Sequence, residues 1–204
     1  MKGLLLKDFY TLTKQMKIFL FIIVIWSLIP GFSVSGFAIV YAGMLPITAL
    51  AYDERCKWDS LAAMMPYSVN SLVLSKYILG YILISCASLL STLAQVIMSF
   101  FKKSPFQFDS FISIVFAIII ALIVQSINLP VMFRLGVEKG RYVYYILLAI
   151  FIIGATAVSD KLLYFLSQIS INLYLLVFYA IIITAIINII SIWISSKIYK
   201  NKVN

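Results

Sequence analysis

The chain has 204 residues, of which 64% are apolar and 11% are charged, and its formal net charge is +9. A soluble domain of this length has too little interior to bury so many apolar side chains, which excludes an ordinary water-soluble fold. In lipid, every backbone polar group must be paired inside a helix or a closed barrel. The long unbroken apolar runs, without the alternation of barrel strands, predict an all-α, polytopic membrane protein.

The first predicted element is a short amphipathic helix over residues 1–17. Leu5, Phe9, Leu12 and Met16 recur at helical spacing, while lysines occupy the other faces. This pattern is typical of an interfacial helix that lies flat on the inner leaflet of a membrane.

Charge-free stretches then follow along the chain, and a helix needs about 20 residues to cross a bilayer. Pro30-Gly31 divides the first stretch, and the more polar segment Ser167–Asn172 precedes the last helix. Residues 159–172 are expected to form a short reentrant or interfacial segment. The sequence therefore predicts one membrane domain over residues 1–204 with six transmembrane helices, at about residues 17–32, 36–52, 74–101, 111–133, 142–158 and 173–195.

The basic residues predict the orientation, because six spans put both termini on the same side of the membrane. If that side is the cytoplasm, only Lys102, Lys103 and Lys161 among the 16 basic residues lie outside. This distribution obeys the positive-inside rule. The basic residues then serve as topology anchors and as contacts for anionic lipid. Nucleic acid is not expected as a partner, because these charges flank the spans and do not cluster.

Several kinds of chemistry have no residues to support them. The chain has no histidine and no G-x-x-x-x-G-K-[ST] phosphate loop, and Cys56 and Cys86 form no metal or disulfide pattern. We find no charged residue inside the predicted spans, where proton relays and ion-coupled carriers need them. We therefore expect no catalytic residue, cofactor site or metal site in this chain, and hence no enzyme.

The few polar residues inside the spans leave two interpretations open. Gln125 and Asn128 lie three positions apart on one helix face, and Gln95 lies in the preceding span. These three residues are candidates for lining a translocation path. The alternative, which we favour, is that they make hydrogen bonds between helices.

The loop over residues 53–73 is the most informative segment outside the spans. Trp58, Leu61 and Met65 form a short apolar stripe, Pro66 ends this helix, and Ser68 is placed to cap the next one. A short helix that meets a span at a sharp angle suits docking on a cytoplasmic partner. An ordinary surface helix, with Trp58 as a lipid anchor, is the alternative.

Three segments resemble a known family. KGLLLKDFYTLTKQ is similar to the N-terminal elbow helix of the membrane subunits of type-2 ATP-binding-cassette (ABC) exporters. DERCKWDSLAAMMPYSVNSLVLSKY resembles their loop after span 2, and LPVMFRLGVEKGRY resembles the loop after span 4 in their small bacterial members. Among these small members, the ones most similar to this chain resemble exporters of amphipathic or antimicrobial peptides, including phenol-soluble modulins.

The resemblance implies a permease in a bacterial cell membrane that pairs with a second copy or a paralogue. A separate nucleotide-binding ATPase subunit would bind ATP and Mg, and the cargo would be an amphipathic or antimicrobial peptide. Rival functions are a self-contained carrier or channel and a non-transporting immunity or scaffold protein. The loop after span 2 would hold the coupling helix that contacts the ATPase, through Asp53, Glu54, Arg55, Trp58, Leu61, Met65 and Pro66.

Overall fold

The computed structural model describes residues 2–15, 17, 21, 22, 25, 32–102, 108–140, 142 and 173–203, and the regular structure in these residues is helical. The predicted spans at 17–32 and 142–158 and the segment 159–172 lie almost entirely outside the described residues. The helices are α1 (Lys2–Gln15), α3 (Phe32–Arg55), α4 (Trp58–Ala63), α5 (Val69–Lys102), α6 (Phe108–Leu135) and α8 (Leu173–Val203).

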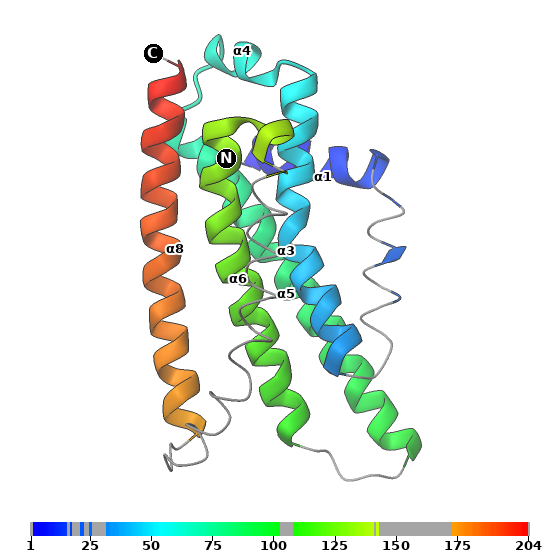
Figure 1. Ribbon diagram of the computed structural model, residues 1–204. Coiled ribbons are helices and arrows are strands. Elements are labelled where there is room, and N and C mark those ends of the chain that lie inside the picture. Colours follow the sequence, from blue (N-terminus) through cyan, green and yellow to red (C-terminus); the bar gives the residue numbers. More distant parts are fainter. Residues whose placement is uncertain are drawn as a thin grey trace.

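Four of the described helices are long and apolar enough to cross a membrane. Their spanning segments are Gly36–Arg55 in α3, Val69–Ile97 in α5, Phe111–Leu135 in α6 and Leu175–Asn201 in α8. They correspond to the predicted spans at 36–52, 74–101, 111–133 and 173–195. In Figure 1 they run lengthwise as a bundle, with α3 packed against α5 and α6, and with α8 packed against α6 and α5.

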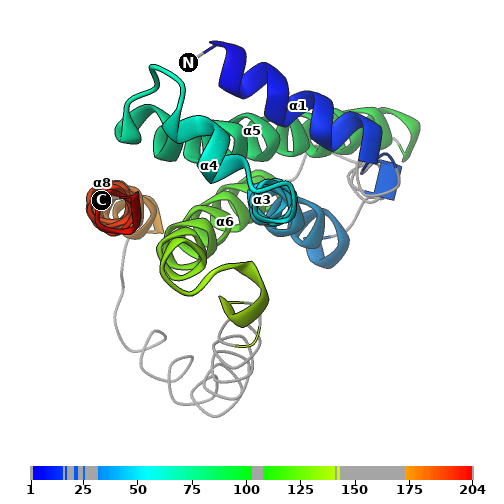
Figure 2. The same ribbon diagram turned by 90° about the horizontal axis from the view of Figure 1, so that it is seen from above.

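The remaining two helices lie at one end of this bundle. α1 crosses the ends of α5 and α3, as the view from above in Figure 2 shows, and it packs against both. α4 lies at the same end, between α3 and α5 in the chain, and the C-terminal end of α8 is also found there. We call this end of the molecule the α4 end.

Small residues bring α3 and α6 close together. Ala38 and Ala42 of α3 and Ala117 and Ala121 of α6 are all buried. A side chain added at Gly43 would place its Cβ 3.3 Å from the carbonyl oxygen of Ala121. Close backbone approach at small residues is how helices gain contact in lipid, where apolar packing alone gives no preference for protein over solvent. α3 is consequently the most enclosed of the four long helices, whereas most of α8 is exposed.

The turns at the α4 end follow from local chemistry. Lys57 takes a left-handed conformation, with φ of 52°, between α3 and α4. The Ser71 N–H donates to Ser68 Oγ at 3.3 Å, which confirms the predicted cap of α5. Gly136, with φ of 76°, ends α6 and donates its N–H to the carbonyl of Met132.

Two sequence predictions are corrected at this end. The segment between the long helices is shorter than the loop predicted over residues 53–73, because α3 continues to Arg55 and α5 begins at Val69. Asp53 and Lys76 therefore lie in the long helices and are buried, so the prediction that the spans carry no charge is wrong at their ends. The physical reason is that these two charges pair with each other across the helices, which removes the cost of burying either alone.

The buried face of α1 also differs from the predicted stripe. Leu4, Asp8 and Leu12, spaced four residues apart, face the bundle, and Leu5 is partly buried beside them. Phe9 is half-exposed, so it lies on the outer face of the helix. The pattern Leu5–Phe9–Leu12 therefore combined two faces, one packed on protein and one open to the surroundings.

Candidate functional site

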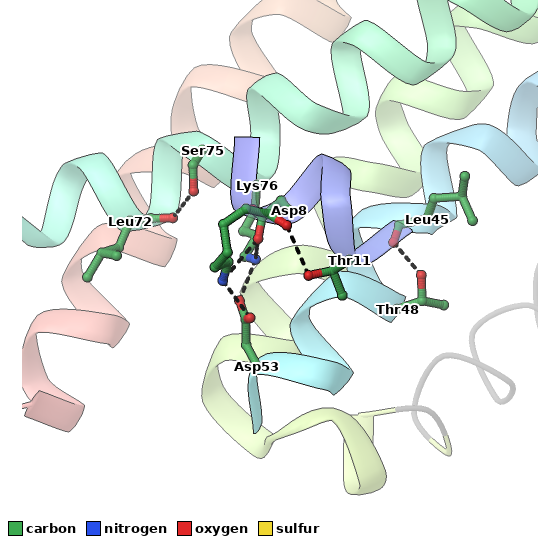
Figure 3. Close-up of polar contacts among 9 residues, drawn as sticks. Asp8, Thr11, Leu45, Thr48, Asp53, Leu72, Ser75 and Lys76 are labelled. Atoms are coloured by element: carbon green, nitrogen blue, oxygen red, sulfur yellow. Dashed lines mark hydrogen bonds and ion pairs between the residues drawn. The ribbon is translucent and has the colours of Figure 1, made fainter. Parts of the chain in front are cut away.

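Four charged side chains from three helices meet beneath α4, and we call them the ionic cluster. They are Lys7 and Asp8 of α1, Asp53 of α3 and Lys76 of α5. Figure 3 shows Asp8, Asp53 and Lys76 pointing toward one another from their separate helices. Lys76 Nζ lies 2.7 Å from Asp8 Oδ1 and 2.5 Å from Asp53 Oδ2, and Lys7 Nζ lies 2.6 Å from Asp53 Oδ1.

The ionic cluster is electrically balanced and closed to ligands. Each lysine contacts both aspartates, so two positive and two negative charges alternate. Asp8, Asp53 and Lys76 are buried, and the adjoining cavity has a volume of only about 10 Å³. Such a space holds at most about one water molecule. The cluster therefore suits holding helices in register and does not suit binding a substrate.

Trp58 covers the outer side of the ionic cluster. The ammonium of Lys7 lies 4.1 Å from the centroid of the Trp58 ring, a cation–π contact between α1 and α4. Trp58 is half-buried, and Ala62, one turn further along α4, is buried. This face of α4 is thus turned toward its own chain, and it ties α4 to α1.

The end of α4 and the turn that follows it carry apolar side chains that the described chain leaves uncovered. Leu61 is 50% exposed, Met65 is 40% exposed and Met64 is 85% exposed, and Tyr67 follows on the same turn. We call these four residues the α4 surface. Isolated apolar residues at a surface need no explanation, but neighbouring exposed apolar residues make this surface a candidate for contact with a partner.

The predicted acidic contact residues both bond within the chain, Asp53 as a buried residue and Glu54 as an exposed one. Asp53 belongs to the ionic cluster, so it is not available at a rim of the α4 surface. Glu54 Oε2 accepts the backbone N–H of Val137 at 2.6 Å and fixes the turn after α6. Adjacent acidic residues thus connect α3 to different neighbours. Arg55 and Pro66 are exposed at the α4 end, so both remain candidates for contact with the ATPase.

The polar residues proposed for a translocation path do not form one site. Gln125 Nε2 donates to the carbonyl of Tyr77 at 3.1 Å, which is the interhelical hydrogen bond that we favoured. Asn128 is buried on the same helix, and its Nδ2 finds no acceptor among the described residues. Gln95 lies on α5 at about 27 Å from Tyr77, at 1.5 Å per residue. It is therefore remote from both of the others.

A groove of about 610 Å³ lies between α5, α6 and α8, and sequence reasoning did not find it. Its polar groups are already paired: the Tyr81 hydroxyl donates to Asn188 Oδ1 at 2.9 Å, and the Thr184 hydroxyl donates to the carbonyl of Ala180. The remaining lining is mainly aliphatic, for example Ile84, Ile118 and Leu122. This groove offers an apolar surface with few free hydrogen-bonding groups.

Two features of this region were not predicted from the sequence. Met64, the most exposed apolar side chain of the α4 surface, was left out of the predicted stripe because only Trp58, Leu61 and Met65 fit one helical face. The roles of Asp8 and Lys76 depend on contacts between segments far apart in the chain, which periodicity cannot show.

Among the described residues no group of three or more His, Cys, Asp or Glu is placed to hold a metal.

The fold and this site define a helical membrane protein in which most of the described charged residues lie at one end of the bundle. The chain belongs to a family described as ABC-2 family transporter protein, whose profile matches residues 3–200. It is accordingly a transmembrane subunit of an ABC transporter, a class in which the membrane subunit is not itself catalytic and works with an ATP-binding subunit. No curated protein and no solved structure matches the chain.

Proposed function

We propose that this chain is the permease of an ATP-driven exporter and that a separate nucleotide-binding ATPase docks on the α4 surface. The observation that carries this proposal is that α4 combines an uncovered apolar surface with a fixed attachment to its own chain. Leu61, Met64 and Met65 are exposed, whereas Trp58 is attached to α1 through Lys7. A partner that binds the α4 surface therefore acts on α1, which the ionic cluster connects to the spanning helices α3 and α5.

The charges at the α4 end support a cytoplasmic location for this docking. Arg55, Lys57, Arg134, Lys139 and Lys197 are all exposed there, near the end of α8. Basic residues concentrate on the cytoplasmic side of bacterial membrane proteins. Both termini would then be cytoplasmic, because α1 and the end of α8 lie at this same end of the bundle.

The ionic cluster bears on the rival function of a self-contained carrier. Carriers use membrane-embedded ionisable groups to bind coupling ions or protons. Here the four charges neutralise one another and have almost no cavity beside them, so they offer no site for an ion. This arrangement favours a permease that receives its energy from a partner.

An amphipathic peptide, exported by a homodimer or heterodimer of such permeases, is the cargo that we propose. The groove between α5, α6 and α8 supports an apolar cargo, because its polar groups are used within the protein. A sugar or an ion would lose its hydration there without gaining new hydrogen bonds.

Co-purification of the ATPase subunit tests the docking proposal. Met64→Asp places a charge at the most exposed apolar position, and a central apolar anchor contributes about 2 kcal/mol or more to an interface. We expect Met64→Asp to abolish co-purification and Met64→Leu to preserve it, with both variants inserted in the membrane at the wild-type level. Unchanged recovery of the ATPase with Met64→Asp and Leu61→Asp would refute docking on the α4 surface.

Trp58→Ala should act through α1 and therefore give a different result. Since the Trp58 ring contacts Lys7 of its own chain, its removal loosens α4 and leaves Met64 in place. We expect the ATPase still to bind, with reduced stimulation of ATP hydrolysis. Loss of binding as complete as with Met64→Asp would mean that Trp58 itself faces the partner.

A further inference from the structure

A second polar network joins α5 to α6 and α8, and we call it the hydroxyl clasp. The hydroxyl oxygen of Tyr77, on α5, lies 2.5 Å from Ser191 Oγ and 2.9 Å from Ser195 Oγ, both on α8. Ser191 Oγ also donates to the carbonyl oxygen of Ser126, on α6, at 2.5 Å. Tyr77, Ser191 and Ser195 are all buried, so the clasp joins three membrane helices inside the protein.

The number of available protons fixes the direction of every bond in the hydroxyl clasp. A carbonyl only accepts, so the single proton of the Ser191 hydroxyl goes to Ser126. Tyr77 must then donate to Ser191, and Ser195 must donate to Tyr77. The chain of donors runs from Ser195 through Tyr77 and Ser191 to the carbonyl of Ser126. Loss of one hydroxyl therefore leaves its neighbours without their partners.

Pro130 explains why the carbonyl of Ser126 is available in the middle of a helix. In α6 this carbonyl would normally accept the N–H of the residue four positions later, which is Pro130. Proline has no N–H, and its ring pushes the carbonyl of residue i−4 aside. The hydroxyl of Ser191, on α8, supplies the missing donor. The carbonyl that Pro130 leaves without a partner in α6 is therefore the point at which α8 is bonded to α6.

The hydroxyl clasp and the ionic cluster meet on consecutive residues of α5. Lys76 bonds to α1 and α3 through Asp8 and Asp53, whereas Tyr77 bonds to α8 through its hydroxyl. The backbone carbonyl of Tyr77 also accepts from Gln125 of α6. Neighbouring residues on a helix point about 100° apart, so Lys76 and Tyr77 contact different neighbouring helices at nearly the same height along α5.

We propose that Tyr77 is a positioning residue of the transport cycle, through which α6 and α8 follow the movement that Lys76 imposes on α5. This inference rests on the proposed function, since it needs a partner that moves α4 and α1. The ionic cluster receives that displacement, and the hydroxyl clasp passes it to the two helices that line the apolar groove with α5. The groove then changes shape as the ATPase closes.

The first measurement uses the chain alone in lipid nanodiscs. Spin labels are placed at Leu89→Cys on α5 and Ile190→Cys on α8, both exposed positions, after Cys56→Ser and Cys86→Ser. We expect a narrow distance distribution that broadens in Tyr77→Phe and in Ser191→Ala. Ser191→Thr, which keeps the hydroxyl, should restore the narrow distribution. Ser91→Ala is the matched control, because the buried Ser91 hydroxyl bonds only within α5 and does not line the groove.

The second measurement uses the complete complex with its ATPase and counts cargo molecules exported per ATP hydrolysed. A buried hydrogen bond left unmade shifts an equilibrium by about fivefold or more, so we expect this ratio to fall about fivefold in Tyr77→Phe and Ser191→Ala. ATPase binding should remain normal, because the α4 surface is untouched. A role in stability alone would lower the amount of folded complex without lowering this ratio.

The two measurements distinguish failure of the proposed role of Tyr77 from failure of the proposed function. A wild-type ratio in Tyr77→Phe and Ser191→Ala would overturn the role of the hydroxyl clasp in transport, even if the distance distribution broadens. The proposed function would survive that result, because Met64→Asp would still remove the ATPase. If the wild-type chain neither binds nor stimulates the ATPase, the proposed function fails, and the role of Tyr77 in coupling fails with it.

Discussion

The ionic cluster and the hydroxyl clasp both hold separate helices together, but they do so with different chemistry. Both join three helices, one of which is α5, but the cluster uses four charges and the clasp uses neutral hydroxyls. Buried charge is tolerated only where every charge has a partner. A neutral hydroxyl costs much less to bury, so the clasp needs only one chain of donors that ends on a carbonyl.

The two networks also differ in how their loss is expected to act. Removing one member of the ionic cluster leaves an unbalanced charge between helices. Removing one hydroxyl of the clasp leaves only an unpaired neutral group. The cluster should therefore dominate the stability of the α4 end, and the clasp should matter more for how movement is passed on.

The largest effect is expected from Lys76→Met. This change leaves Asp8 and Asp53 facing each other with only Lys7 between them, and an unbalanced buried charge costs about 3–5 kcal/mol. Thermal unfolding in detergent should show a large loss of stability, whereas Lys139→Met, at an exposed lysine, should show almost none. Restored stability in Lys76→Met combined with Asp53→Asn would support charge balance, and equal loss in both would contradict it.

A smaller effect is expected from Gly80→Ala, at the level of the hydroxyl clasp. A Cβ at Gly80 would overlap the side-chain amide of Gln125, which is held in place by its bond to the Tyr77 carbonyl. Forcing an extra methyl group into such a contact costs about 1–3 kcal/mol. Unfolding measurements on Gly80→Ala, Gln125→Ala and the double variant give the coupling. Additive losses would show that α5 and α6 do not meet closely here.

The smallest effect is expected from Ser191→Ala. It removes the bond to the Ser126 carbonyl and the acceptor for Tyr77, and a lost hydrogen bond of this kind costs about 1 kcal/mol. Thermal unfolding should therefore separate Ser191→Ala clearly from Lys76→Met. If the two variants lose equal stability, the distinction between a charged and a neutral network is wrong.

The long helices were predictable from the sequence because lipid imposes a simple rule on each segment. Any charge-free run of sufficient length must pair its backbone internally, so α3, α5, α6 and α8 follow from local composition. Ser68 was predictable as the cap of α5 for a similar reason, since it satisfies N–H groups within four residues of itself.

The two networks could not be predicted, because their bonds join distant parts of the chain. Asp8 and Lys76 are 68 positions apart, and Tyr77 and Ser195 are 118 positions apart. Pro130 does indicate that a carbonyl four residues earlier lacks its usual donor. Nothing local shows that this donor is Ser191. The face of α1 was misjudged in the same way, since only tertiary packing distinguishes Leu4 and Asp8 from Phe9.

ATP hydrolysis by the candidate nucleotide-binding subunit, measured with and without this chain in nanodiscs, decides whether the chain is the membrane partner of that ATPase. We expect no turnover by the chain alone, stimulated turnover by the complex, and loss of this stimulation with Met64→Asp but not with Met64→Leu. Nucleotide turnover by the chain free of any partner would contradict the proposed function. So would an ATPase whose activity is the same with and without the chain.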